Sequence, residues 1–161
     1  MRKWAILLLL AGMYGTGWTV QAASCPTPDE FVVAAELSRR GYTVAFTQGR
    51  HVPVYDLLAG TSKGEAFTVD VKGQAFKSAW LVRDKTARTN LFYILAFVPL
   101  GGEKREPDQL FILTQDEVRD LNARYRENHP NQSAKSKEMG GFNFSDALPH
   151  KDAWHKLPPA K

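Results

Sequence analysis

Two acidic residues and a lysine of this sequence have the types and spacing needed for metal-dependent chemistry. Asp70-Val71-Lys72 lies on a strand-like segment, and Asp56 lies at the end of the segment before it. Magnesium prefers hard oxygen ligands and keeps several of its waters when it binds to proteins. One of these waters can attack a phosphate, with a lysine ammonium beside the developing charge. The residues therefore predict hydrolysis of phosphodiester bonds.

The pattern around the triplet predicts how its side chains are oriented. Between Ala66 and Lys72, apolar residues alternate with polar ones, and successive side chains of a strand point to opposite faces. Asp70 and Lys72 are therefore expected side by side on one face. The alternative is a simple ion pair on an exposed strand face, which would contribute little to stability.

The surrounding elements predict an α/β fold. A helix is expected from Thr27, where threonine, proline and Glu30 form an N-terminal capping sequence, to the residues before Gly41. A second helix is expected from Thr114 to about Glu127. The apolar run Leu91–Leu100 predicts a strand in the middle of a sheet that helices cover. The other predicted strands are Tyr42–Phe46, Val54–Ala59, Ala66–Lys72 and Leu110–Leu113.

Length and composition favour a single domain. The chain has 161 residues, 43% of them hydrophobic, which is enough for a core without disulfide or metal staples. We assign residues 25–161 to this domain, with a mobile loop at 128–141 and a packed C-terminal extension at 142–161. The formal net charge of +4 falls to +2 without Arg2 and Lys3, so binding of nucleic acid would need a local basic patch.

The first 24 residues have the pattern of a signal peptide or an N-terminal membrane anchor. Arg2 and Lys3 precede a charge-free apolar run, residues 4–20, which small residues follow. Export, or tethering through residues 4–20, would place the protein in the periplasm, outside the cell or at a membrane. If translation starts downstream, the protein would be cytoplasmic.

Four sequence segments resemble the PD-(D/E)xK nuclease superfamily, and most closely its archaeal Holliday-junction-resolvase-type branch. The resemblance extends over about Pro28 to Thr114 and rests on Glu30, residues 39–44, residues 55–58 and residues 68–73. It implies a restriction-endonuclease-like αβββαβ core with a mixed central sheet flanked by helices. It also implies an endonuclease that uses Mg²⁺ or Mn²⁺ and acts on DNA.

The resemblance assigns roles to particular residues. Asp56, Asp70, Glu30 and the backbone carbonyl of Val71 would hold the metal, and Lys72 would orient the attacking water or stabilise the phosphate charge. Two positions depart from the family pattern, since Tyr55 replaces a proline and Asp70 replaces the commoner glutamate. For Glu30, the capping role alone is the alternative.

Basic residues directly after the triplet are candidates for DNA contacts. The segment 77–88 has a net charge of +3, because Asp84 is its only acidic residue. Trp80 within it could stack on a base or belong to the core. The candidate nucleic-acid contacts are Lys77, Arg83, Lys85, Arg88 and Gln74.

Two alternatives to a nuclease stay open. One is a catalytically inactive nuclease-fold module that binds nucleic acid or protein. The other is an α/β interaction protein in which the triplet is coincidental. Resolvases of the resembled branch act as dimers, so a homodimer is a further expectation.

Overall fold

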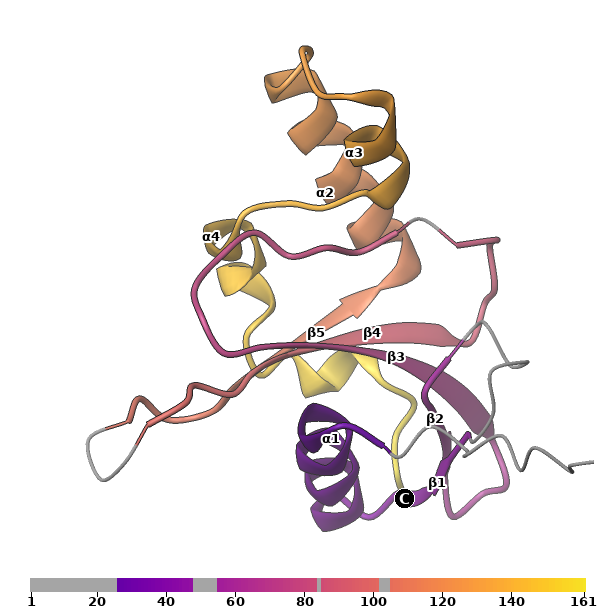
Figure 1. Ribbon diagram of the computed structural model, residues 1–161. Helices are drawn as coiled ribbons and strands as arrows, with labels where there is room; N and C mark the ends of the chain where they lie inside the picture. Colours follow the sequence, from indigo (N-terminus) through magenta and orange to yellow (C-terminus); the bar gives the residue numbers. More distant parts are fainter. Residues whose placement is uncertain (1–25, 48–54, 84, 102–104) are drawn as a thin grey trace, which may run out of the picture.

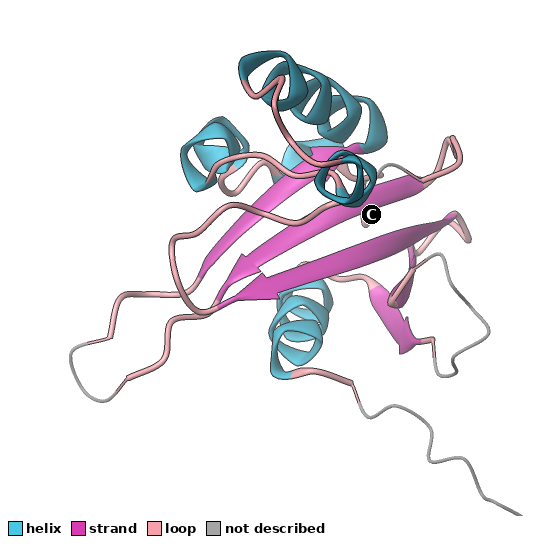
Figure 2. Ribbon diagram, turned by 45° about the horizontal axis from the view of Figure 1, so that its top comes forward, coloured by secondary structure: helices cyan, strands magenta, loops and turns pink. Residues whose placement is uncertain are grey.

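The computed structural model describes residues 26–47, 55–83, 85–101 and 105–161. The fold is α/β, with a five-stranded mixed sheet flanked by helices, as predicted (Figures 1 and 2). Its elements in chain order are α1 (Pro28–Arg39), β1 (Thr43–Phe46), β2 (Leu57–Gly60), β3 (Ala66–Gln74), β4 (Leu91–Phe97), β5 (Gln109–Thr114), α2 (Gln115–Asn128), α3 (Ala134–Met139) and α4 (Phe144–Ala147), followed by the 3₁₀ turns Leu148–His150 and Trp154–Lys156.

The predicted signal peptide or anchor at 1–24 lies outside the described residues. Among those that are described, no helix is long and apolar enough to cross a membrane.

The five strands lie in the sheet in the order in which they follow along the chain. All neighbouring strands are antiparallel except β3 and β4, which are parallel. A parallel pair requires a crossover connection, usually a helix. Here the described parts of the crossover, residues 75–83 and 85–90, contain no helix, unlike the corresponding connection of an αβββαβ core. An antiparallel bridge between Trp80 and Phe142 holds this crossover over the sheet.

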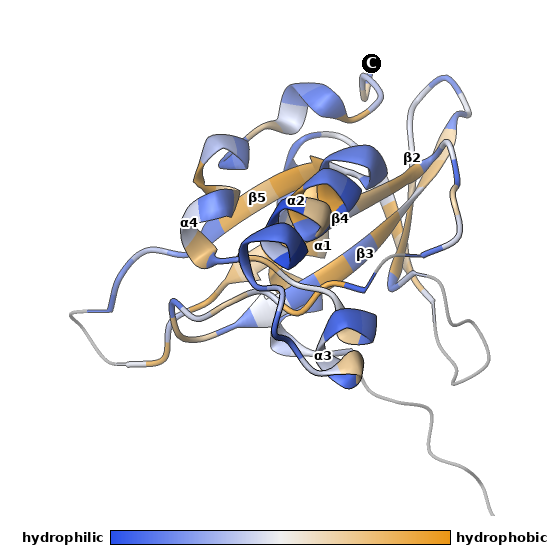
Figure 3. Cartoon of the chain, turned by 90° about the horizontal axis from the view of Figure 1, so that it is seen from above, coloured by the Kyte–Doolittle hydropathy of each residue, from blue (hydrophilic) through white to orange (hydrophobic). Residues whose placement is uncertain are grey.

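Each face of the sheet has its own hydrophobic core. Helix α1 places Val33 and Leu37 against Val69 and Val71 on one face. On the other face, α2, the crossover and the C-terminal segment cover Tyr93 and other buried residues of β4 and β5. All seven residues of β4 are buried, which confirms its predicted position inside the sheet. Figure 3 shows the apolar strands beneath the mainly hydrophilic α2 and α3.

The C-terminal segment packs along β5 and reaches the region of α1. The Asp152 N–H donates to the carbonyl of Leu110 at 2.9 Å, and Lys156 Nζ donates to the carbonyl of Ile112 at 3.1 Å. Farther along, the Tyr42 hydroxyl donates to the carbonyl of Pro158 at 2.6 Å. The end of the chain therefore fastens β5 and the end of α1 to one another.

The segment 128–141, predicted as a loop, contains helix α3 and ends in a tightly packed turn. Ser133 caps α3 by accepting a hydrogen bond from the backbone N–H of Ser136. After the helix, the Gly141 N–H donates to the buried Asn122 Oδ1 at 2.7 Å. This turn brings the chain to Phe142 and its bridge with Trp80.

Replacing Gly141 by alanine is expected to destabilise the protein by about 2–3 kcal/mol. Gly141 has φ +149°, and a Cβ there would lie 2.5 Å from the carbonyl oxygen of Trp80. Gly64→Ala is the control, because Gly64 also has positive φ (+83°) but no atom within 4 Å of the new Cβ. Urea unfolding of both variants measures the difference. If Gly141→Ala and Gly64→Ala lower the free energy of unfolding equally, the close approach of Gly141 to Trp80 contributes nothing to the effect.

Candidate functional site

Strands β2 and β3 bring Asp56 and Asp70 together. The antiparallel register that pairs Leu57 with Val69 places Asp56 opposite Asp70. The Asp56 N–H donates to the carbonyl of Val69 at 2.9 Å, and Asp56 Oδ2 accepts from the N–H of Val71 at 2.7 Å. Both carboxyl groups therefore lie at the same place on the sheet, fixed by backbone hydrogen bonds.

Asp70 is buried, and two lysines neutralise it. Its side chain is 1% exposed, and its Oδ1 and Oδ2 form ion pairs with Lys72 Nζ and Lys85 Nζ respectively. Lys72 Nζ also donates to the carbonyl of Val71 at 3.2 Å. Because a buried carboxylate without a partner is strongly destabilising, these ammonium groups are needed to keep Asp70 where it is. The predicted pairing of Asp70 with Lys72 is present, but Asp70 is buried and not on an exposed face.

The pKa of Asp56 is raised from 3.8 to about 6, chiefly because burial disfavours its charged form. The N–H of Val71 and the charge of Lys72 lower this pKa, whereas the charge of Asp70 and a hydrogen bond to it raise it. The charge of Asp70 thus makes ionisation of Asp56 harder, as expected where two acids share one site. A cation between them would relieve this repulsion.

Asp56→Asn is expected to raise the stability of the metal-free protein at pH 7.5. Because the folded-state pKa lies above the unfolded value, Asp56 costs stability increasingly as the pH rises from 4 through 6. Asparagine removes that cost and still offers an oxygen to the N–H of Val71. Because Asp56 is partly exposed, the expected effect is reduced by solvent screening. The free energy of unfolding should rise by about 1 kcal/mol, which corresponds to about 3 °C in Tm.

Thermal unfolding at pH 7.5 and pH 4 in the presence of a chelator measures this effect. The gain should vanish at pH 4, where Asp56 of the folded protein is already protonated. If Asp56→Asn is equally stabilised at both pH values, or is destabilised at pH 7.5, burial is not the cause of the raised pKa of Asp56.

The structure does not bring Glu30 together with Asp56 and Asp70. Its backbone N–H is capped by Thr27 Oγ1 at 3.4 Å, and α1 packs on the face of β3 opposite to Asp70. The acidic residue of α1 that touches β3 is Asp29, whose carboxylate fills the space where a side chain at Gly73 would lie. In the part of the chain that the structure describes, no three His, Cys, Asp or Glu residues could jointly hold a metal.

Two of the exposed basic residues of the crossover pair with acidic residues of other segments. Lys77 Nζ lies 2.6 Å from Glu106, and Arg83 lies 3.4 Å from Glu138. Arg88 is exposed. These three cations of the predicted DNA-contact set are on the surface, where ion pairs are weak and exchange readily with other anions.

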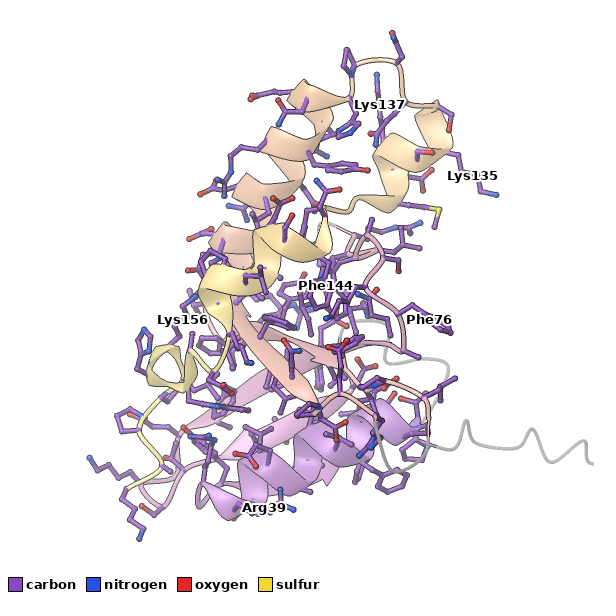
Figure 4. All side chains as sticks on the ribbon, turned by 90° about the vertical axis from the view of Figure 1, so that its left-hand side faces the viewer. Arg39, Phe76, Lys135, Lys137, Phe144 and Lys156 are labelled. Carbon is purple, nitrogen blue, oxygen red and sulfur yellow. The ribbon has the colours of Figure 1, made fainter. Side chains whose placement is uncertain are left out.

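Two other residues of this region have roles within the protein. Gln74 Nε2 donates to the carbonyl of Ser78 at 3.3 Å, and Gln74 Oε1 accepts from the Ser78 hydroxyl at 3.1 Å. Trp80 is 1% exposed and packs against Phe111 and Phe144, with ring centroids 6.0 and 5.9 Å away. Trp80 is therefore a core residue and is not available to stack on a base. Figure 4 shows Phe144 among closely packed side chains between the helices and the sheet.

Lys85, a predicted DNA contact, forms an ion pair with Asp70 that sequence reasoning did not foresee. Gln115, the first residue of α2, fixes the backbone beside it. Gln115 Nε2 donates to the carbonyls of Lys85 and Thr86 at 2.9 and 3.0 Å, and Gln115 Oε1 accepts from the Arg88 N–H at 2.7 Å. No spacing in the sequence indicates this contact, because it depends on the path of an irregular crossover.

The donors gathered at this site fit a divalent cation with few protein ligands. Asp56 and Asp70 offer carboxylate oxygens, and the carbonyl of Val71, which accepts from Lys72 Nζ, offers a third oxygen. Magnesium commonly binds through one or two carboxylates and completes its octahedron with water. This set is smaller than the predicted one because Glu30 is not part of it.

Comparisons of this chain with protein-family models, with curated proteins and with solved structures give no match. The resemblance to PD-(D/E)xK nucleases therefore rests on the motifs around Glu30, Asp56 and Asp70 and on the residues that flank them.

Proposed function

We propose that the chain is a metal-dependent endonuclease that hydrolyses phosphodiester bonds of DNA. The observation that carries the proposal is the meeting of Asp56, Asp70 and Lys72 at one place on two adjacent strands. Two carboxylates with a lysine beside them are the donor set that metal-assisted phosphodiester hydrolysis requires.

The residues of the site would divide the work as follows. Asp56, Asp70 and the Val71 carbonyl would hold Mg²⁺ or Mn²⁺. When bound, the cation would lower the pKa of a water and neutralise charge on the phosphate. Lys72 is about one-third exposed, so its ammonium can contact both Asp70 and a substrate oxygen. Because the pKa of Asp56 is about 6, the site offers two negative charges only above that pH.

The basic surface of the crossover supports a polyanionic substrate. Lys77, Arg83 and Arg88 belong to the crossover that covers this face of the sheet. The partners of the first two, Glu106 and Glu138, are themselves more than half exposed. Phosphates of a nucleic-acid strand could replace these carboxylates at little cost.

Cleavage of supercoiled plasmid and of a four-way DNA junction by the full chain tests the proposal. We expect cleavage with Mg²⁺ or Mn²⁺ and none with a chelator. Lys72→Met, which keeps the apolar stem and removes the charge, should reduce the rate by about a hundredfold or more. Lys63→Met in the exposed β2–β3 turn is the control and should cleave normally. The proposal would be refuted if the native chain does not cleave DNA, or if the native chain, Lys72→Met and Lys63→Met all cleave at the same rate.

A binding module without catalysis is the second candidate. It is favoured by one observation: both oxygens of Asp70 are already neutralised by Lys72 and Lys85, so the fold does not require a metal there. In that case the native chain should retard DNA in gels with the same affinity in chelator, Mg²⁺ and Mn²⁺, and leave it intact.

A further inference from the structure

Lys85 occupies the oxygen of Asp70 that Lys72 leaves open. Lys72 Nζ contacts Oδ1 and Lys85 Nζ contacts Oδ2, and Asp70 is 1% exposed. Each oxygen of the carboxylate is thus bound to an ammonium group. A divalent cation that uses Asp70 as a ligand would therefore compete with these ammonium groups for the carboxylate.

The two lysines differ in the kind of segment that carries them. Lys72 belongs to β3, two residues from Asp70, and its Nζ also donates to the Val71 carbonyl. Lys85 comes from the irregular crossover, and its side chain is 21% exposed. Lys72 is the more exposed of the two side chains, at 33%, but its backbone belongs to a strand, whereas that of Lys85 does not. Departure of the Lys85 ammonium from Asp70 would leave the hydrogen bonds of the strands in place. The backbone of Lys85 stays in place meanwhile, because Gln115 Nε2 holds its carbonyl.

Electrostatics make this exchange favourable. The site gathers the two carboxyl groups of Asp56 and Asp70 and the two ammonium groups of Lys72 and Lys85. A divalent cation added to that set would face two nearby like charges in a partly buried place, where such repulsion is strong. Departure of Lys85 removes half of the repulsion and frees the Asp70 oxygen at the same time.

We propose that Lys85 is a built-in competitor of the divalent cation. Its ammonium neutralises Asp70 while no metal is bound, and it leaves Asp70 when Mg²⁺ or Mn²⁺ binds. The released ammonium then lies beside the site, where it can contact a substrate phosphate. This inference rests on the proposed function, since it assumes that Asp56 and Asp70 bind a metal.

Titration of the full chain with Mn²⁺, followed by electron paramagnetic resonance of the free ion, tests the competition without any measurement of activity. Lys85→Gln removes the charge and keeps a hydrogen-bond donor for Asp70, so it should bind Mn²⁺ at least about tenfold more tightly than the native chain. Lys63→Gln, an exposed lysine of the β2–β3 turn, is the matched control and should bind with native affinity.

A second measurement uses the native chain alone and does not depend on the folding of a variant. Acetylation of lysines, read by mass spectrometry, should become several-fold faster at Lys85 when Mn²⁺ saturates the site. The rate at Lys63 should not change. Tighter binding by Lys85→Gln or this selective exposure of Lys85 supports the exchange.

Two results would overturn the inference in distinguishable ways. If the native chain binds Mn²⁺ but Lys85→Gln binds no more tightly and Lys85 labels at an unchanged rate, the lysine is not a competitor and the metal site stands. If neither chain binds Mn²⁺, the metal site itself is refuted, and the proposed nuclease with it.

Discussion

Asp70→Asn is expected to reduce metal-dependent DNA cleavage by about a thousandfold or more. The substitution removes one of the two carboxylates available to a cation and leaves Lys72 and Lys85 facing an amide. The site then carries more positive than negative charge, which opposes binding of Mg²⁺ or Mn²⁺. Single-turnover cleavage at saturating DNA, with metal concentration as the variable, measures the loss.

The loss must be separated from simple unfolding. Asparagine has the size of aspartate, and both lysines can turn toward solvent. We therefore expect Asp70→Asn to lower the free energy of unfolding by only about 2 kcal/mol. Circular dichroism should show a folded protein at the assay temperature. Asp120→Asn, an exposed acidic residue of α2, serves as the control and should cleave at the native rate. Cleavage by Asp70→Asn within a factor of a few of the native rate would refute the assigned role.

Trp80→Ala is expected to lower the free energy of unfolding by about 3–5 kcal/mol, the usual cost of truncating a large buried aromatic residue. For a domain of this size, that corresponds to a fall in Tm of about 10 °C or more. The ring packs against Phe111 and Phe144, and the backbone N–H of Trp80 donates to the Phe142 carbonyl at 2.8 Å. Differential scanning calorimetry of the metal-free protein measures the change.

Phe76 provides a control of similar chemistry. It belongs to the same crossover, is 71% exposed and projects from the surface (Figure 4). Phe76→Ala should change Tm by about 1 °C or less. A comparable fall in both variants would mean that Trp80 does not anchor the crossover.

The sequence predicted the sheet and the two long helices well because local patterns determine them. Capping residues marked the starts of α1 and α2, where Thr27 and Thr114 each accept a hydrogen bond from the third residue of the helix. Alternation marked β3, and the uniformly apolar run marked β4. The C-terminal turns and α3 were missed because they are short and are held by distant partners, such as Ile112 for Lys156.

At the candidate site, the sequence predicted which residues meet on neighbouring strands. Asp56, Asp70 and Lys72 come together because strand register is set by the alternating apolar residues. The sequence could not predict that Lys85 crosses over the sheet to Asp70, since no periodicity governs an irregular segment. It also selected Glu30, whereas the acidic residue of α1 that lies against Gly73 of β3 is Asp29. A shift of one position on a helix turns a side chain by about 100°.

The hydrogen bonds between the C-terminal segment and β5 restrict how two copies of this chain could associate. Along the outer side of β5, the carbonyls of Leu110 and Ile112 are already occupied by Asp152 and Lys156. An edge occupied in this way cannot accept a strand from another molecule. A homodimer that extends the sheet must therefore be built at the four-residue β1, and removal of the last eleven residues would open a second edge and favour aggregation.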